Sequence, residues 1–231
     1  MITFLKDFYF PSQLLRDHDF NSMCAGGKVL EQDERGVKVI QLTSGEILKI
    51  FRVKRLLSGT NLYSYARRFC RNAVRLTRLD IPTVKIKALF YFDSSNNTAV
   101  LYQPLEGETL RQIVHNNDFD LRLADDMSDF LAELHQKGIH FHSLHTGNVV
   151  QTPDGDLGLI DISDMSIYPW PLFCNTRVRS FKRLCKYRDD ISKLGEAFWN
   201  DFLGQYFVKS RLSNSCRDKI KRENAKLRLF Q

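Results

Sequence analysis

The stretch LHQKGIHFHSLHTGN, residues 134–148, joins the end of a predicted helix to a loop crowded with polar side chains. Residues 127–134 place apolar side chains at the i, i+3, i+4 and i+7 spacing of an amphipathic helix, and Gly138 is well suited to end it. Residues 148–160 then predict a small hairpin around the turn Pro-Asp-Gly. The loop therefore lies between a helix and a hairpin, where its side chains can gather at one site.

The rest of the chain predicts an α+β protein with two lobes, residues 1–103 and 104–231. The first lobe is dominated by short alternating segments, and the second is mostly helical. Strands are expected to begin at residue 29 and to cover 37–42, 47–51, 85–92 and 98–103, with one helix at 65–79, and later helices are expected around 181–184, 191–207 and 217–229.

The net charge of +7 is distributed unevenly along the chain. Residues 47–79 contain nine Lys or Arg and no acid, and residues 177–188 contain six more and no acid. Such segments favour an anionic partner, which could be a nucleotide, a phosphorylated sugar, an acidic lipid or a nucleic acid. A solvated basic face is the alternative for most of the individual side chains.

Cysteines and the first segment bear on the cellular compartment. The five cysteines are widely spaced and contain no CxxC pair, so we expect reduced, mostly buried thiols in a cytoplasmic protein. The start, MITFLKDFYF, contains Lys6 and Asp7 and lacks a small-residue cleavage site, so an amphipathic first segment of the fold is expected in place of a signal peptide. No apolar run is long enough to span a membrane.

Three residues at a distinctive spacing suggest a nucleotide site. Lys49 lies in a predicted strand, where its ammonium group can hold the α- and β-phosphates of ATP. Asn148 ends the loop and Asp161 follows the hairpin, and both offer hard oxygen ligands for Mg²⁺. A strand lysine, a loop asparagine and a later aspartate are typical of protein-kinase-like sites. Taken singly, Lys49 could instead point to solvent at a strand edge, Asn148 could form a turn, and Asp161 could cap one.

Residues 27–168 resemble the bacterial lipopolysaccharide-core sugar kinases. The matching pieces are GEILKIFR, ARRFCRNAVRLTRLDIPTV, LYQPLEGETLRQIV, LHQKGIHFHSLHTGN and LGLIDISDM. This family includes heptose and Kdo kinases and InaA-type relatives, often labelled toluene-tolerance proteins. The resemblance depends on order and spacing, with 94 residues from Lys49 to Ser143, five more to Asn148 and thirteen more to Asp161. It implies a two-lobed protein-kinase-like fold, with a five-stranded antiparallel N-lobe sheet, one N-lobe helix and a helical C-lobe.

The resemblance also implies cofactors and partners. ATP and Mg²⁺ would be the cofactors, with Lys49 on the phosphates and with Asn148 and Asp161 on the metal. The hinge bordering the adenine would be Gln103, Pro104 and Leu105. The acceptor would be an anionic sugar of the lipopolysaccharide core or a related envelope glycolipid. The basic segments would allow peripheral contact with the anionic inner face of the cytoplasmic membrane.

The sequence departs from the kinase pattern at three places. The glycine-rich phosphate loop is replaced by residues 32–36, which keep only Gly36. The glutamate expected on the helix after Lys49, near Arg68 or Phe69, is absent. Ser143 stands where the pattern has the catalytic aspartate, and a serine cannot serve as a carboxylate base.

The histidines around Ser143 leave several hypotheses open. His142 and His145 flank it, and with an ordinary histidine pKa either could take a proton. A nucleotide-binding pseudokinase acting as a scaffold or regulator in envelope biogenesis is the alternative to an active enzyme. RNA binding is disfavoured because no RNA-binding module is recognisable. Zinc held by His140, His142 and His145 is a further reading, although H-x-H-x-x-H is not a well-defined ligand spacing.

Overall fold

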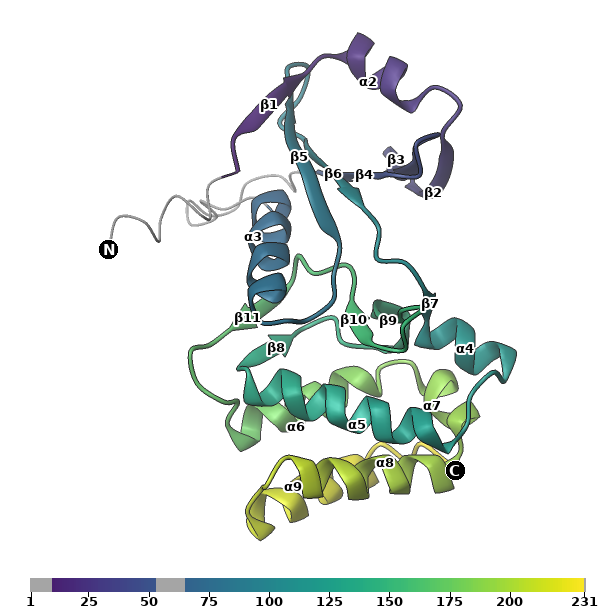
Figure 1. Ribbon diagram of the computed structural model, residues 1–231, viewed down its shortest axis with the longest axis vertical. Helices are drawn as coiled ribbons and strands as arrows, with labels where there is room; N and C mark the ends of the chain where they lie inside the picture. Colours follow the sequence, from purple (N-terminus) through teal and green to yellow (C-terminus); the bar gives the residue numbers. More distant parts are fainter. Residues whose placement is uncertain (1–9, 53–64, 231) are drawn as a thin grey trace. The chain divides into compact units, whose positions relative to one another are not determined.

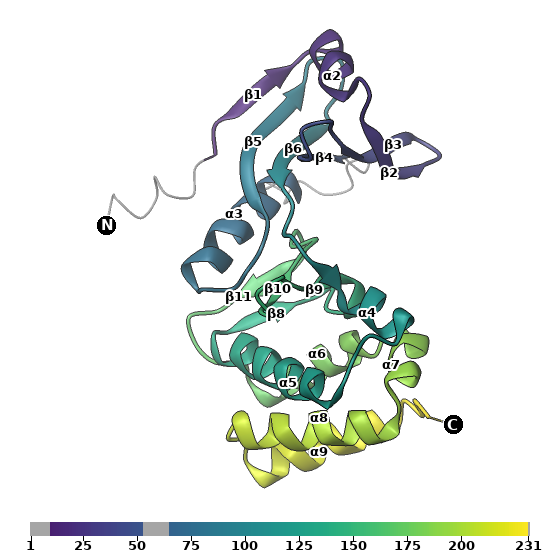
Figure 2. The same cartoon turned by 45° about the vertical axis from the view of Figure 1, so that its right-hand side comes forward.

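The computed structural model describes residues 10–52 and 65–230, which form a mixed α+β protein (Figures 1 and 2). The chain divides into two compact units, one ending at Leu105 and one beginning at Glu106. Apart from Phe10, the predicted amphipathic first segment lies outside the described residues, as do Lys54 and Arg55 of the first basic run. None of the described helices is both long enough and apolar enough to cross a bilayer.

The described part of the first unit is built on a six-stranded mixed sheet, so the expected five-stranded antiparallel sheet is wrong. The strand order is β1-β5-β6-β4-β3-β2, and β1 runs parallel to β5 while the other neighbours are antiparallel. The strands are β1 (Ser12–Leu15), β2 (Lys28–Asp33), β3 (Gly36–Gln41), β4 (Ile47–Phe51), β5 (Lys85–Phe92) and β6 (Thr98–Gln103).

The extra elements of this unit come from its first described residues. β1 is only four residues long, SQLL, and lacks an apolar–polar alternation, so the sequence gives no signal for it. The short helix α2 (Asp17–Cys24) has no fully buried residue, and its apolar face consists only of Phe20, Met23 and Cys24, which pack partly buried against the sheet. This apolar pattern is too short to predict a helix from the sequence. The expectation of a single helix in this unit is therefore also wrong.

The two faces of this sheet are packed differently. On one face, Leu15, Ile40, Leu48 and Phe90 belong to a buried apolar cluster. The other face is covered by α3 (Tyr65–Arg78), whose predicted apolar side is confirmed because its members, Phe69, Ala73 and Leu76, are all buried.

The second unit combines helices with two small sheets. The predicted hairpin is confirmed as β9 and β10, and β7 adds a third strand to it, while β8 and β11 pair separately. The expected helix at 191–207 is interrupted at Gly195, whose φ of 85° is incompatible with a continuous α-helix. The elements are β7 (Glu108–Thr109), α4 (Leu110–Asn116), α5 (Leu121–Gln136), β8 (Ile139–Phe141), η1 (Thr146–Asn148), β9 (Val149–Gln151), β10 (Leu157–Leu159), β11 (Met165–Ile167), α6 (Cys174–Leu184), α7 (Arg188–Leu194), α8 (Glu196–Lys209) and α9 (Asn214–Ala225).

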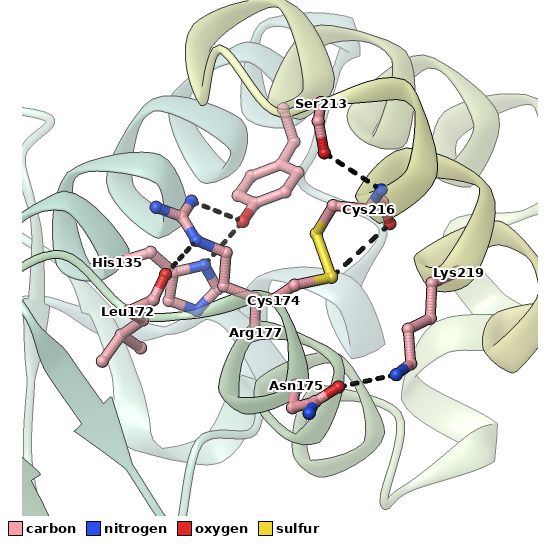
Figure 3. The surroundings of a disulfide bond; sticks show 9 residues. His135, Leu172, Cys174, Asn175, Arg177, Ser213, Cys216 and Lys219 are labelled. Atoms are coloured by element: carbon pink, nitrogen blue, oxygen red, sulfur yellow. Dashed lines mark hydrogen bonds between the residues drawn. A yellow bond between two sulfur atoms is a disulfide. The ribbon is translucent and has the colours of Figure 1, made fainter.

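A disulfide joins α6 to α9 (Figure 3). Cys174 and Cys216 are bonded with their Cα atoms 5.8 Å apart, so the expectation that all five cysteines are reduced thiols is wrong for this pair. The two lie 42 residues apart in sequence, and only the packing of α6 beside α9 brings them together. Cys70 and Cys185 are buried free thiols, and burial raises the pKa of each to about 12.

A buried polar cluster also holds α6 in place (Figure 3). Arg177 donates from Nε to the carbonyl of Leu172 at 2.8 Å and from Nη1 to the Tyr206 hydroxyl at 3.1 Å. His135 Nδ1 lies 2.7 Å from the same hydroxyl. Arg177 is 4% exposed, so this member of the second basic segment holds helices together and does not face an anionic partner.

Candidate functional site

The candidate site lies on the loop between β8 and β9. The last part of this loop is the short helix η1, which is held by a backbone hydrogen bond. The amide N–H of Asn148 donates to the carbonyl of His145 at 2.9 Å. The Asn148 side chain, which is mostly buried, donates from Nδ2 to the carbonyl of Ser143 at 2.9 Å. Because Nδ2 is used by the loop, Oδ1 is the atom of Asn148 that can coordinate a cation.

The hairpin brings Asp161 to the same end as Asn148. Val149 pairs with Leu159 across β9 and β10, and the N–H of Ile160 donates to the Asn148 carbonyl at 3.1 Å. Asp161 is exposed and has a φ of 52°, a left-handed conformation that aspartate adopts more readily than most residues. Its negative charge acts on His145. The two predicted metal ligands therefore leave the hairpin at one end, and an amide oxygen with a carboxylate is a donor set suited to Mg²⁺.

The N-terminal half of the loop, residues 142–143, is held by Asp164. The N–H of His142 donates to the carbonyl of Asp164 at 3.0 Å, and His142 Nδ1 lies 3.1 Å from the Asp164 carboxylate. An ionised carboxylate only accepts hydrogen bonds, so Nδ1 carries the proton and Nε2 is left as the acceptor. The Ser166 hydroxyl lies 3.4 Å from Nε2. A carboxylate that fixes the tautomer of a partly exposed histidine is an arrangement suited to general-base chemistry.

The C-terminal half of the loop, residues 145–148, places its histidine differently. His145 Nδ1 accepts a hydrogen bond from the Gly147 N–H at 3.2 Å, and its ring lies against the Tyr187 ring at 4.8 Å between centroids. Burial, followed by the charges of Arg111 and Lys186, lowers the pKa of His145 to about 4. The expectation that His145 has an ordinary histidine pKa is therefore wrong, because its surroundings disfavour the imidazolium form.

A buried carboxylate anchors this second half. Asp190, on α7, accepts hydrogen bonds from the Thr146 hydroxyl and, at 2.9 Å, from Arg111 Nε, while His115 Nε2 lies 3.1 Å from its other oxygen. Burial by itself would raise the pKa of Asp190, but the hydrogen bonds from Thr146, Arg111 and His115 outweigh it and leave the pKa below its usual value. Arg111 also stacks over the Tyr187 ring at 4.3 Å. The loop is thus tied to both α4 and α7.

In the first unit, Lys49 lies within the sheet. Strand β4 is bordered by β3 and β6, and Lys49 pairs with Val39 and Val100, so the alternative of a solvent-pointing lysine at a strand edge is wrong. Its ammonium nitrogen lies 5.7 Å from the Phe51 ring centre and 5.8 Å from that of Phe69. Phe69 is one of the two positions at which the kinase pattern would place a glutamate. The Phe69 ring therefore lies near the Lys49 ammonium group at a position where the kinase pattern has a glutamate.

The remaining predicted positions lie at the edges of the first unit. Gln103 is the last residue of β6, pairing with Lys85, and Pro104 and Leu105 are half-buried. Asp33 and Glu34, which lie where the kinase pattern has its glycine-rich loop, are both exposed.

The three histidines of the loop do not form a zinc site. His140 is buried on β8 with its ring 4.5 Å from that of His142, while His145 packs against Tyr187. Throughout residues 10–52 and 65–230, no group of three His, Cys, Asp or Glu side chains is placed to hold a metal ion.

Sequence reasoning missed both anchoring carboxylates. Asp164 lies three residues after Asp161, and this proximity was the only available hint that it belongs to the site. Asp190 carries no such signal, because its partners lie 44, 75 and 79 residues away along the chain. The scan against protein-family models and the search of curated proteins both found no match for this chain.

Proposed function

We propose that this protein is a kinase-like phosphotransferase that uses ATP and Mg²⁺ to phosphorylate a hydroxyl group of an anionic sugar or glycolipid, in the class of the lipopolysaccharide core. The proposal depends on one observation: Asn148 and Asp161 lie at the same end of the β9–β10 hairpin. Asn148 also ends the hydrogen-bonded loop that precedes this hairpin. Phosphoryl transfer depends mainly on positioning and on electrostatic stabilisation, and both can be supplied by a rigid loop with hard oxygen ligands.

The roles of Lys49, Asn148 and Asp161 in the proposal come from the sequence resemblance, and the hydrogen bonds of the loop support the choice of base. Asn148 Oδ1 and the Asp161 carboxylate would hold Mg²⁺, which when bound neutralises charge on the phosphates. Lys49 would contact the phosphates. His142 would accept the proton of the acceptor hydroxyl, because Asp164 holds its ring with Nε2 as the acceptor. His145 is the weaker candidate base because its pKa is lowered to about 4 and its Nδ1 already accepts from Gly147.

The acceptor class rests on the sequence resemblance and on the excess of basic residues. The two acid-free segments contain fifteen Lys or Arg residues in total, and this excess of positive charge favours an acceptor that already carries phosphate or carboxylate groups. Of the second segment, Arg179, Lys182, Arg183, Lys186 and Arg188 are exposed. Because Lys182 pairs with Glu223 at 2.6 Å, its charge is partly compensated, and the other four are the better candidates to meet the acceptor.

A nucleotide-binding pseudokinase is the second candidate, and two observations favour it. Ser143 supplies no carboxylate to the loop. Lys49 lies against the rings of Phe51 and Phe69, and the helix that covers this face of the sheet, α3, contains no acidic residue. In that case the same residues would bind nucleotide without transferring phosphate, and the protein would act as a scaffold or regulator.

A thermal-shift titration with ATP, with and without Mg²⁺, tests the nucleotide site shared by both candidates. We expect stabilisation that requires the metal and that reaches about 2.7 kcal/mol when ATP is at 100 times its dissociation constant. Asp161→Asn should abolish the metal-dependent part. Asp156→Asn, which changes an exposed aspartate in the turn of the same hairpin, is the matched control and should leave it intact. No stabilisation by ATP in the wild-type protein, with or without Mg²⁺, would refute both candidates, whereas stabilisation that does not depend on the metal would leave only the pseudokinase.

Incubation with ATP, Mg²⁺ and a panel of core oligosaccharides separates the two candidates. Transfer of phosphate to an oligosaccharide, lost in Asp161→Asn and kept in Asp156→Asn, is expected of the phosphotransferase. Metal-dependent ATP binding without transfer to any acceptor in the panel would establish the pseudokinase in its place.

A further inference from the structure

A groove between α8 and α9 lies away from the loop and is not used by the proposed function. The two helices run side by side in both views (Figures 1 and 2). Trp199, Leu203 and Phe207 of α8 line it together with Leu229 from the residues after α9, and it encloses about 680 Å³. This volume lies in the range of small-molecule sites in proteins, which are concave and mostly apolar with a few polar groups.

A glycine keeps the groove open. Gly204 lies within α8 and lines the groove, and a Cβ atom added there would meet nothing within 4 Å. Glycine inside a helix is less stable than alanine by about 1 kcal/mol, so packing and helix propensity do not explain its presence.

Polar groups are placed at one part of this apolar groove. Asn224 is 7% exposed, and its Nδ2, among the described residues, lacks a hydrogen-bond partner although the residue lines the groove. Lys221 lies one turn earlier on α9 and holds its ammonium group 5.7 Å from the Phe207 ring. Arg228 also lines the groove. An unused buried donor near two cations calls for a ligand with a negatively charged acceptor group.

Among the described residues that line the groove, the one acid, Glu196, makes the two ends of the groove differ in charge. Glu196 lies in the first turn of α8, about three helical turns from Phe207, which is contacted by Lys221. An anionic head group is therefore favoured beside Lys221 and Asn224 and disfavoured beside Glu196. The apolar body of the ligand would then lie along Leu203, Gly204 and Trp199.

We propose that this groove binds an aliphatic carboxylate, an acyl chain ending in a carboxylate group. Asn224 Nδ2 would donate to a carboxylate oxygen, Lys221 and Arg228 would supply the opposite charge, and the chain would fill the space over Gly204. This site is independent of the phosphotransfer chemistry proposed above, so either can fail without the other.

Fluorescence quenching by bromododecanoate tests the site directly. The chain contains two tryptophans, and Trp170→Phe leaves Trp199, in the wall of the groove, as the reporter. We expect saturable quenching in this background. Gly204→Phe, which fills the open space, should weaken binding at least tenfold, and Gly204→Ala is the matched control, expected to leave affinity within about twofold. Lys221→Ala should weaken binding severalfold and does not depend on tolerance of a bulky residue.

Competition with unlabelled ligands tests the chemical class. Dodecanoate should displace the probe, while dodecanol, which keeps the chain and lacks the charge, should compete at least tenfold less well. Equal competition by dodecanol, quenching that is unchanged in Gly204→Phe, or no saturable quenching would each overturn the proposal. A concentration-dependent dimer that Gly204→Phe dissociates would assign the groove to a second copy of the chain and would overturn it as well.

Discussion

The two halves of the 142–148 loop are each held by a carboxylate, but the two carboxylates lie in different environments. In the N-terminal half, the side chains of His142 and Asp164 are 31% and 45% exposed. In the C-terminal half, Asp190 is only 5% exposed and collects hydrogen bonds from three partners. An exposed pair contributes little to stability, whereas a buried and fully bonded carboxylate is costly to disturb.

Under the proposed function, this difference separates a structural half of the loop, residues 145–148, from a reactive half, residues 142–143. Around Asp190, the side chains of Thr146, Arg111 and His115 are hydrogen-bonded to its carboxylate. The nearby His145 is neutral because its pKa is lowered to about 4. His142 keeps a partly exposed ring whose Nδ1 faces the Asp164 carboxylate and whose Nε2 is left as the acceptor. The two histidines therefore differ: His145 belongs to the structural half of the loop, whereas His142 is suited to proton transfer.

The largest expected effect comes from breaking the buried anchor. Asp190→Ala should lower the free energy of unfolding by about 3 kcal/mol, because the buried Thr146 hydroxyl and the partly exposed Arg111 guanidinium both lose their acceptor. Urea denaturation monitored by circular dichroism measures the change. Asp164→Ala, the corresponding change at the exposed anchor, should cost less than about 1 kcal/mol.

A neighbouring residue provides the matched control for this change. Asp189 precedes Asp190 on α7 and is exposed, so Asp189→Ala should change stability by no more than about 0.5 kcal/mol. Equal losses for Asp190→Ala and Asp164→Ala would contradict the division of the loop into two kinds of anchor.

The next effect concerns the reactive half and depends on the proposed phosphotransfer. His142→Gln should lower kcat about 100-fold, since general-base catalysis contributes roughly 10²- to 10⁴-fold. Asp164→Asn should lower kcat about tenfold, because the ring loses the partner that orients it. Steady-state rates with saturating ATP measure both changes. His18→Gln, which changes an exposed histidine of α2, serves as the control and should leave kcat unchanged.

Much of the local structure could be predicted from the sequence. The hairpin after the loop and the apolar face of α3 follow from periodicity and turn chemistry, which are local signals. The six-stranded sheet was missed because β1 is four residues long and gains its stability from pairing with β5, at residues 89–92. The break at Gly195 was missed because one glycine does not distinguish a helix end from a tolerated interior position.

The candidate site was predictable only where its residues belong to one stretch of sequence. The positions of Ser143, Asn148 and Asp161 follow from the loop and hairpin alone. The roles of Asp190 and Arg111 depend on contacts between α4, η1 and α7, and the Cys174–Cys216 bond depends on α6 packing beside α9. Such long-range pairings leave no periodic trace in the sequence.

A smaller effect should appear in the pH dependence of stability. The pKa of His145 is about 4 in the folded protein, below its value of about 6.5 in the unfolded chain. The unfolded chain therefore binds the proton first as pH falls, so this contribution is complete above pH 6.5 and is lost as pH falls towards 4. Because His145 is partly exposed, we expect about 2 kcal/mol of the total loss in this window to come from it.

His145→Gln tests this assignment because glutamine does not titrate. Urea denaturation at several pH values between 4 and 7 should show a shallower loss of stability in His145→Gln than in the wild-type protein. Asp190 does not interfere in this window, since its own pKa lies below the usual range of aspartate and its contribution is lost only at lower pH. An identical slope in the two proteins would contradict the lowered pKa of His145.

The smallest effect is expected from restoring a carboxylate to the reactive half. Ser143→Asp places a base at the position where the kinase pattern has one, and Ser143 contributes only its backbone carbonyl to the hydrogen bond from Asn148. The loop should therefore keep its geometry, and the rate of phosphate transfer should rise about tenfold, short of the full effect of a base because His142 already accepts a proton. Ser143→Asn, of similar size but without a charge, should give no gain. The gain should be larger in a His142→Gln background, because the new carboxylate then replaces the proposed base. Equal gains in both backgrounds would show that His142 does not act as a base.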